Sequence, residues 1–157
     1  MTTQAIEATS PNIFHLLETC IEVSTDGEKA YAVAAADARA PELKALFHDY
    51  SAQRSEFVRA LTAQMQTLGG APAIHGTASG SALRSLMGMR LVVEGNKDEV
   101  LLAECERAER RALAAYDRAF RRTPLDTVPT DVSAILVEQR GAIERAHADV
   151  LRRLAGQ

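Results

Sequence analysis

Apolar residues recur every three or four positions along four long stretches of the chain. That spacing places them on one face of an α-helix, so each stretch is predicted to be an amphipathic helix. Ser10-Pro11 is a favourable helix start, and Gly69-Gly70 is a favourable stop. Residues 1–10 are mostly polar and are expected to be disordered. The predicted helices cover residues 11–39, 41–68, 98–121 and 130–154.

The lengths of the connections predict how these helices pack. A short break at Arg39-Ala40 makes the first two helices antiparallel neighbours, and a proline-containing loop joins the third to the fourth. A much longer stretch, residues 69–96, lies between the two pairs. The predicted fold is therefore all-α, a single domain over residues 11–156 built as a four-helix bundle of two antiparallel αα-hairpins.

The long connection contains an apolar segment over residues 83–94, closed by Gly95-Asn96. We predict a short crossover helix there, which is too apolar to be exposed on every side. It could lie on the bundle, or its outer face could join a second subunit; both interpretations stay open. We expect a homodimer through this face.

The second hairpin repeats the first at a nearly fixed offset. The third helix matches the first at an offset of 85 (105 − 20, 116 − 31), in the pairs Cys20/Cys105 and Tyr31/Tyr116. The fourth matches the second at 86 (139 − 53), in the pair Gln53-Arg54/Gln139-Arg140. Duplication and a shared structural constraint would both produce such a repeat. A long connection between two hairpins is the topology of ferritin-like bundles.

Polar residues interrupt the apolar stripe near the middle of each helix. They could hydrogen-bond one another, and a buried Glu109 without a metal would need donors around it. The helices therefore predict one connected polar layer across the core, which can fix the register of the helices at some cost in stability. Its expected members are Ser24, Gln53, Glu109 and Gln139, with Tyr31 and Tyr116 beside them.

Several short motifs carry a resemblance to a known family. They are Asp26-Gly27 with Tyr31, residues 41–47, Tyr50 with Gln53-Arg54, Gly69-Gly70 with Pro72, residues 102–107 with Glu109, Tyr116, and His147 with Asp149. From about Ile13 to Leu154, the chain resembles an uncharacterised bacterial ferritin-like four-helix-bundle family, a domain of unknown function distantly similar to rubrerythrins. The resemblance implies a ferritin-like bundle and, loosely, a stress-related role, without an agreed activity.

The resemblance also implies where metal ligands would lie. In rubrerythrin-like helices, a glutamate ligand precedes an inward tyrosine by seven residues, which gives Ser24 and Glu109 here. The Glu-x-x-His slots of the other two helices fall on Gln53 with Glu56, and on Gln139 with Ala142. Only Glu109 matches, and Glu56 could replace a histidine. Two irons would lack the negative charge they require, so we expect a degenerate site and favour no cofactor.

One literal Glu-x-x-His is present, Glu144 to His147. On a helical wheel, Glu144 points away from the core-facing stripe and His147 lies at its edge. We favour an exposed glutamate and a hydrogen-bonded histidine over a ligand pair. The alternative is a reduced site for iron or another divalent metal, built from Glu56, Glu109, Glu144 and His147.

Charge and composition narrow the choice of partners. The 157-residue chain has a net charge of −3, which gives no strong attraction to nucleic acid or to an anionic membrane. Cys20 and Cys105 form no CxxC motif and are expected to be reduced, buried thiols on diagonally opposed helices. The N-terminus lacks the features of a signal peptide, and no apolar run could span a membrane. We expect a cytoplasmic protein.

Three functions remain open. We favour a non-catalytic or uncharacterised helical-bundle protein, which associates with itself and is linked to stress. The first alternative is a metal-binding protein for metal storage or di-iron oxidation. The second is a protein that holds a small apolar ligand between its hairpins.

Overall fold

A computed structural model describes residues 2–72 and 97–156 of the chain. These ranges contain helices and no strand, which confirms the predicted all-α class. None of the described helices is both long and apolar enough to cross a membrane. The elements are α1 (Thr2–Asp37), α2 (Pro41–Thr67), α4 (Lys97–Arg122), the short 3₁₀ helix η1 (Leu125–Thr127) and α5 (Thr130–Ala155).

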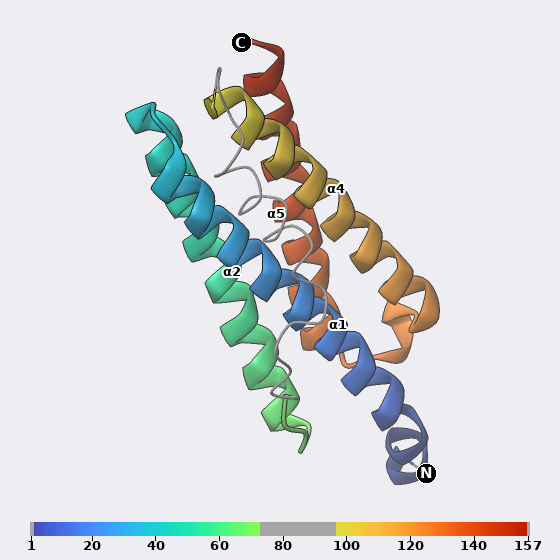
Figure 1. The fold of residues 1–157 in the computed structure, drawn as a ribbon. Coiled ribbons are helices and arrows are strands. Elements are labelled where there is room, and N and C mark those ends of the chain that lie inside the picture. Colours follow the sequence, from blue (N-terminus) through green and yellow to red (C-terminus); the bar gives the residue numbers. More distant parts are fainter. Residues whose placement is uncertain (1, 73–96, 157) are drawn as a thin grey trace.

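The four long helices pack side by side as two antiparallel hairpins (Figure 1). One hairpin is α1 with α2, and the other is α4 with α5. Between the hairpins, α1 packs on α4 and α2 packs on α5. The end of α2 and the start of α4 lie at opposite ends of the bundle (Figure 1). The crossover helix predicted over residues 83–94 falls outside the described residues.

The turn between α1 and α2 is anchored to the start of α4. The backbone N–H groups of Arg39 and Ala40 donate to the two carboxylate oxygens of Asp98, over 2.7 and 2.9 Å. These donors lie at the end of α1 and before α2, where no helical partner satisfies them. Asp98 therefore fixes the first turn of α4 against the closed end of the other hairpin.

Seven of the eight boundaries of the long helices agree with the prediction to within two residues, and one does not. Helix α1 begins at Thr2, so it includes most of the segment expected to be disordered and places Pro11 in its interior. The predicted start at Ser10-Pro11 is therefore wrong. An interior proline costs one backbone hydrogen bond, but Ala5, Glu7 and Ala8 before it have good helix propensity.

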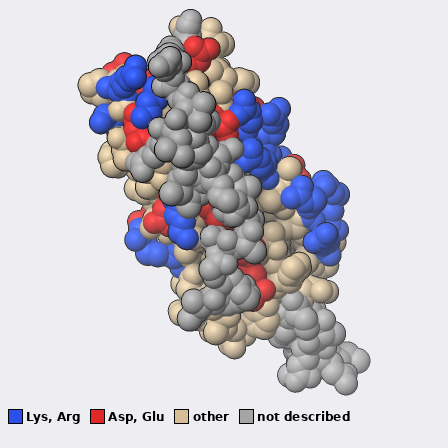
Figure 2. Space-filling view, in the orientation of Figure 1, with Lys and Arg blue, Asp and Glu red and all other residues tan. Residues whose placement is uncertain are grey.

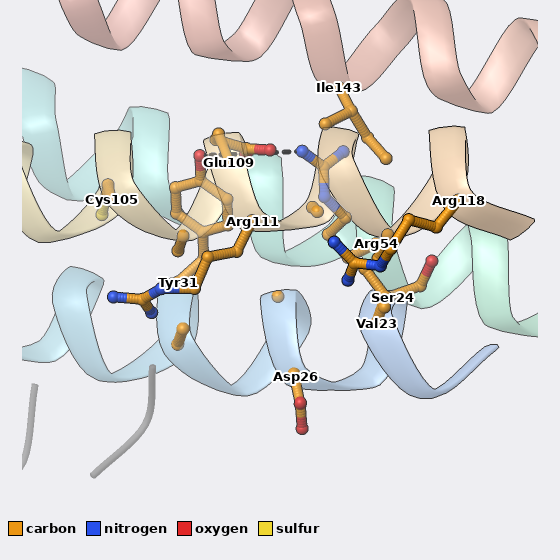
Figure 3. A pocket seen from close by; sticks show the side chains of 15 residues that line it. Val23, Ser24, Asp26, Tyr31, Arg54, Cys105, Glu109, Arg111, Arg118 and Ile143 are labelled. Carbon is orange, nitrogen blue, oxygen red and sulfur yellow. Dashed lines mark hydrogen bonds and ion pairs between the residues drawn. The ribbon is translucent and has the colours of Figure 1, made fainter. Parts of the chain in front are cut away.

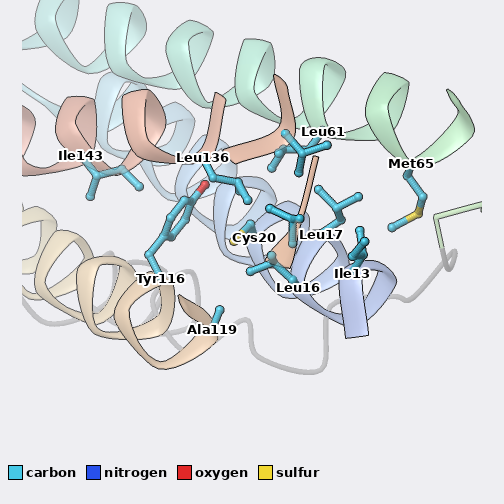
Figure 4. Packing of buried hydrophobic residues seen from close by; sticks show 12 residues of the cluster. Ile13, Leu16, Leu17, Cys20, Leu61, Met65, Tyr116, Ala119, Leu136 and Ile143 are labelled. Atoms are coloured by element: carbon cyan, nitrogen blue, oxygen red, sulfur yellow. The ribbon is translucent and has the colours of Figure 1, made fainter. Parts of the chain in front are cut away.

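Two apolar clusters form the core, one toward each end of the bundle. The first is built from larger side chains and includes Leu17, Leu61 and Leu136 (Figure 4). The second contains a stripe of alanines on α1, against which Phe47 and Leu102 pack. The polar side chains described below lie where these two clusters meet.

Both cysteines are buried and free, as predicted, although the predicted reason is wrong. Helices α1 and α4 are neighbours, not diagonally opposed. Because these neighbours run antiparallel, equivalent positions on them lie toward opposite ends of the bundle. Cys20 accordingly belongs to the first cluster and Cys105 to the second.

Candidate functional site

The centre of the bundle holds a buried ion pair between α2 and α4. The Arg54 guanidinium donates to the Oε1 atom of Glu109 over 2.5 Å, and each residue is only 2% exposed. The Tyr31 hydroxyl donates to the same carboxylate oxygen. One carboxylate of the second hairpin is therefore held by an arginine and a tyrosine from the first (Figure 3).

Arg54 has further partners that compensate for its burial. A second guanidinium nitrogen donates to the side-chain oxygen of Gln53 over 2.6 Å. The guanidinium carbon also lies 5.9 Å from the centroid of the Tyr31 ring and 5.2 Å from that of Phe57. Contacts at this range with the face of a ring stabilise a cation. Hydrogen bonds and two aromatic rings thus compensate for the burial of the Arg54 charge.

Gly27 of α1 makes room for this arginine. A Cβ atom at Gly27 would lie 3.3 Å from Cγ of Arg54 and 3.4 Å from Cδ, which is tighter than an ordinary van der Waals contact. The absence of a side chain on α1 therefore lets the aliphatic part of Arg54 pass close to the helix backbone.

A second polar group lies beside the ion pair and carries no charge. The hydroxyls of Ser24 and Tyr116 are 3.3 Å apart, and Tyr116 donates to the side-chain oxygen of Gln139 over 3.0 Å. The amide nitrogen of Gln139 donates to the backbone carbonyl of Phe57 over 3.4 Å. All three polar side chains are buried, and together they connect α1, α4, α5 and α2.

The polar residues therefore form two groups and not the single layer that was predicted. Because α1 and α4 are antiparallel, Ser24 faces Tyr116, while Glu109 faces Tyr31. Each tyrosine binds the polar residue seven positions before the tyrosine of the other helix (31 − 24, 116 − 109). The two hydrogen bonds are thus reciprocal, with Ser24 taking the place that Glu109 has in the other half.

The prediction missed Arg54, because it assigned the neighbouring Gln53 to the core-facing stripe of α2. Gln53 is partly exposed. On a helical wheel of α2 alone, a charged residue such as Arg54 is assigned to the solvent-exposed face. The partner that allows Arg54 to be buried, Glu109, lies on another helix. Two signals pointed to Arg54: a buried glutamate that required a cation, and a glycine inside the facing helix.

The corresponding arginine of the second hairpin lies outside the core. Arg140 follows Arg54 at the offset of 86 (140 − 54), but it pairs with Asp117 over 2.7 Å and with Glu144 over 3.2 Å. This pairing is partly exposed. The hydrogen bond from Arg140 lowers the pKa of Asp117 below its ordinary value. The two halves of the bundle therefore differ at their centres.

The residues considered as metal ligands do not come together. Glu56 is exposed and pairs with Arg59, while Glu144 is exposed and pairs with Arg140. His147 bonds the carboxylate of Glu106 over 2.9 Å, as expected for a histidine at the rim. Across residues 2–72 and 97–156, no group of three or more His, Cys, Asp or Glu side chains is arranged to hold a metal ion.

The buried hydroxyls and thiols stay protonated at neutral pH. Burial raises the pKa of Tyr31 well above its ordinary value, and the nearby Glu109 charge raises it further. Burial likewise raises the pKa of Tyr116, and it raises that of Cys20 to about 12. These groups can donate hydrogen bonds, but they are poor bases and poor nucleophiles.

A cavity of about 190 Å³ opens beside the ion pair, between α1 and α4 (Figure 3). Glu109, Arg54 and Tyr31 line it on one side, together with Ser24. The other Glu109 oxygen, Oε2, is buried and has no hydrogen-bond partner among the described residues. The cavity wall is therefore largely apolar, and Oε2 has almost no accessible surface.

Comparison with known proteins identifies a family and gives no activity. No protein with a curated description matches the chain significantly. The family model described as "Domain of unknown function (DUF2383)" matches residues 12–122, which include most of α1, all of α2 and all of α4. Because this match covers more than half of the sequence, the chain belongs to the DUF2383 family.

Proposed function

We propose that this protein is a non-catalytic, ferritin-like helical bundle with a degenerate metal site, in which an internal arginine supplies the positive charge. The observation that carries the proposal is the ion pair between Arg54 and Glu109, over 2.5 Å with both groups buried. Glu109 is the one position where the expected glutamate ligand is present. Its charge is already balanced by a residue of the same chain.

Metal binding at Glu109 would disturb this balance. A divalent ion prefers several anionic oxygen ligands, and Ser24 and Gln139 at the neighbouring positions are uncharged. A metal that took the carboxylate would also leave Arg54 buried without its partner, which costs several kcal/mol. The packing of the guanidinium against Tyr31 and Phe57 opposes its movement out of the core.

The ferritin-like assignment is supported by the placement of the helices. Two antiparallel hairpins lie side by side, and α4 begins at the end of the bundle opposite to the end of α2 (Figure 1). A long connection between such hairpins is characteristic of ferritin-like bundles. The family resemblance is the basis for a stress-related role.

Self-association forms part of the same proposal. The apolar sequence over residues 83–94 is the part of the chain that we expect to contact a second copy. We expect a homodimer at micromolar concentration, measured by light scattering or sedimentation. A monomer mass would contradict this expectation. An unchanged dimer in the Leu86→Asp or Val93→Asp variant would place the interface elsewhere.

Metal analysis of the purified protein tests the central proposal. Protein from cells supplemented with iron and zinc should contain far less than one equivalent of either metal. Added iron should leave its melting temperature unchanged. Glu109→Ala should not alter the metal content, and Glu138→Ala, at an exposed glutamate outside the candidate ligands, is the matched control. Stoichiometric metal that disappears in Glu109→Ala alone would support the metal-binding alternative instead.

A further inference from the structure

Two cavities lie along the groove between α1 and α4, and the proposed function uses neither. The larger cavity, of about 190 Å³, has an apolar wall that includes Val23, Ala112 and Ile143. The smaller cavity, of about 130 Å³, lies toward the end of α4 and shares Ala115 and Arg118 with the larger one. Since an apolar cavity of about 150 Å³ accommodates benzene, the larger cavity has room for one aromatic ring.

The buried ion pair adds no accessible net charge to the larger cavity. Arg54 and Tyr31 both donate to the Oε1 atom of Glu109, and Oε2 has almost no accessible surface. Arg54 and Glu109 are each only 2% exposed. Because their opposite charges are in direct contact, their fields largely cancel at a distance. The charges that a ligand would meet are therefore those at the exposed rim of the cavity.

Arginines are the main charged residues of this rim. Arg111 and Arg118 are exposed and line the cavity. Within the part of the chain that the structure describes, neither has an ion-pair partner, whereas Arg107 and Arg110 on the same helix pair with glutamates. Asp26 also lines the cavity, and its carboxylate extends from α1 away from α4 (Figure 3). The rim thus carries two positive charges and one negative charge.

The excess of positive charge continues along the groove. His15 and Arg122 line the smaller cavity with Arg118, and none of the described residues that line it is acidic. Lys and Arg side chains also gather along the side of the molecule where α4 lies (Figure 2), although the whole chain has a net charge of −3. Because a cleft lined by one sign of charge concentrates the opposite ion, the groove should attract anions and repel cations.

We propose that the larger cavity binds a small monoanion with an apolar body, of the size and type of an aromatic carboxylate such as benzoate. The ring packs against the alanines and Ile143, and the carboxylate lies at the rim beside Arg111 and Arg118. A guanidinium can donate two parallel hydrogen bonds to a carboxylate. One negative charge also balances the excess of one positive charge at the rim. This binding site goes beyond the scaffold role and does not depend on it.

Three probes of nearly the same shape test the selection by charge. Benzoate is an anion, benzamide is uncharged and benzamidine is a cation. Binding to the full chain is measured by NMR titration of backbone amides, which also locates the site. We expect benzoate to bind one site per chain and at least about fivefold more tightly than benzamide, since each contact with an exposed arginine contributes modestly. Benzamidine should bind more weakly than benzamide, and added salt should reduce the advantage of benzoate.

Two arginine variants test the role of the rim. Arg118 lines the cavity, while Arg121 on the same helix is also exposed and lines neither cavity. Both Arg118→Gln and Arg121→Gln remove one positive charge, so the net charge of the protein changes equally. Arg118→Gln should weaken benzoate binding at least about twofold and leave benzamide binding unchanged. Arg121→Gln should leave the binding of both probes unchanged.

Two alanine variants test the position of the ring. Ala108 lines the larger cavity, while Ala114 on the same helix is similarly half-buried and does not line it. Ala108→Leu should fill part of the cavity and weaken the binding of both benzoate and benzamide at least about tenfold, because close-packed interiors tolerate little overlap. Ala114→Leu should leave both unchanged. Circular dichroism verifies that all variants fold.

Four results would overturn the inference. Benzoate that binds no more tightly than benzamide would show that the rim does not select an anion. Equal benzoate affinities of Arg118→Gln and Arg121→Gln would remove the role of the rim arginine. Unchanged benzoate binding in Ala108→Leu would place the ligand outside this cavity. No binding of any probe at millimolar concentration to the unmodified chain would show that the cavity takes up only water. None of these results depends on the metal content, so they leave the scaffold proposal to its own test.

Discussion

The buried ion pair makes a quantitative prediction about stability. Arg54→Met keeps a long apolar side chain in the space of the arginine but leaves Glu109 charged and buried. Glu109→Gln keeps the shape of the glutamate, and its side-chain oxygen can still accept from Tyr31. The double variant removes both charges at once. Comparing the three variants separates the cost of an unpaired charge from the value of the pair.

The magnitude follows from the burial of both partners, each 2% exposed. Removing one member of a buried pair costs roughly 3–5 kcal/mol, because the other charge stays in the core without compensation. For a chain of this length, about 2–4 °C of melting temperature corresponds to 1 kcal/mol. Each single variant should therefore melt roughly 6–20 °C lower. The double variant should be less destabilised than either single variant.

Urea unfolding followed by far-ultraviolet circular dichroism at pH 7 is the appropriate assay. The matched control is Arg140→Met, at the equivalent position of the second hairpin. Arg140 pairs with Asp117 at a partly exposed site, so its loss should cost no more than about 1 kcal/mol. The dependence of the unfolding free energy on urea concentration should be similar among the variants, so that their unfolding midpoints can be compared.

Two results would refute the reasoning. If Arg54→Met destabilised the protein no more than Arg140→Met, the guanidinium would not compensate a buried charge. If the cost of the double variant equalled the summed costs of the single variants, Arg54 and Glu109 would act independently. Either result would also remove the physical basis for a resident cation in place of a metal.

Three further predictions follow from the packing and the titratable groups. A Cβ atom at Gly141 would meet only the flexible end of an arginine, so Gly141→Ala should raise the free energy of unfolding by about 0.5–1 kcal/mol. Gly27→Ala should raise it less, or lower it, because the new Cβ atom would press on Arg54. Equal increases for the two variants in urea unfolding would contradict the close contact at Gly27. The pKa of Asp117 is lowered in the fold, so its contribution is present above its unfolded pKa of about 4 and is lost as pH falls through the folded value. Asp117→Asn should therefore flatten the fall of stability between pH 5 and pH 2, measured by urea unfolding, and an unchanged slope would count against the ion pair. Because burial raises the pKa of Cys20 to about 12 and that of Cys105 even higher, neither thiol should react with a disulfide reagent at pH 8 until urea unfolds the chain; rapid reaction of the folded protein would contradict their burial.

The helices and their hairpin pairing could be predicted from the sequence because local signals determine them. Pro41 marks the start of α2, Gly69-Gly70 its end, and the apolar stripe repeats at helical spacing. The start of α1 could not be predicted in this way. The Ser10-Pro11 pair looks the same in the sequence whether a helix begins there or has begun a few turns earlier. Only the residues before Pro11 distinguish these two cases.

The centre of the bundle was less predictable, since it depends on contacts between distant residues. The burial of Arg54 requires Glu109, which lies 55 residues away, and the space left by Gly27 on a third helix. A wheel drawn for one helix contains none of this. It therefore selected Gln53, whose side chain instead supports Arg54 from a partly exposed position. The antiparallel packing of α1 on α4 then divided the expected layer into two groups.

The difference between the two hairpins also affects which hairpins can pack on each other. Because the hairpins are similar, two copies of the first hairpin could in principle pair in place of the native combination. Such a pairing would set Ser24 opposite Tyr31 and bury two Arg54 side chains with no carboxylate between them. That state is heavily penalised. The ion pair of Arg54 with Glu109 therefore favours the packing of a first hairpin on a second hairpin over the packing of two first hairpins on each other.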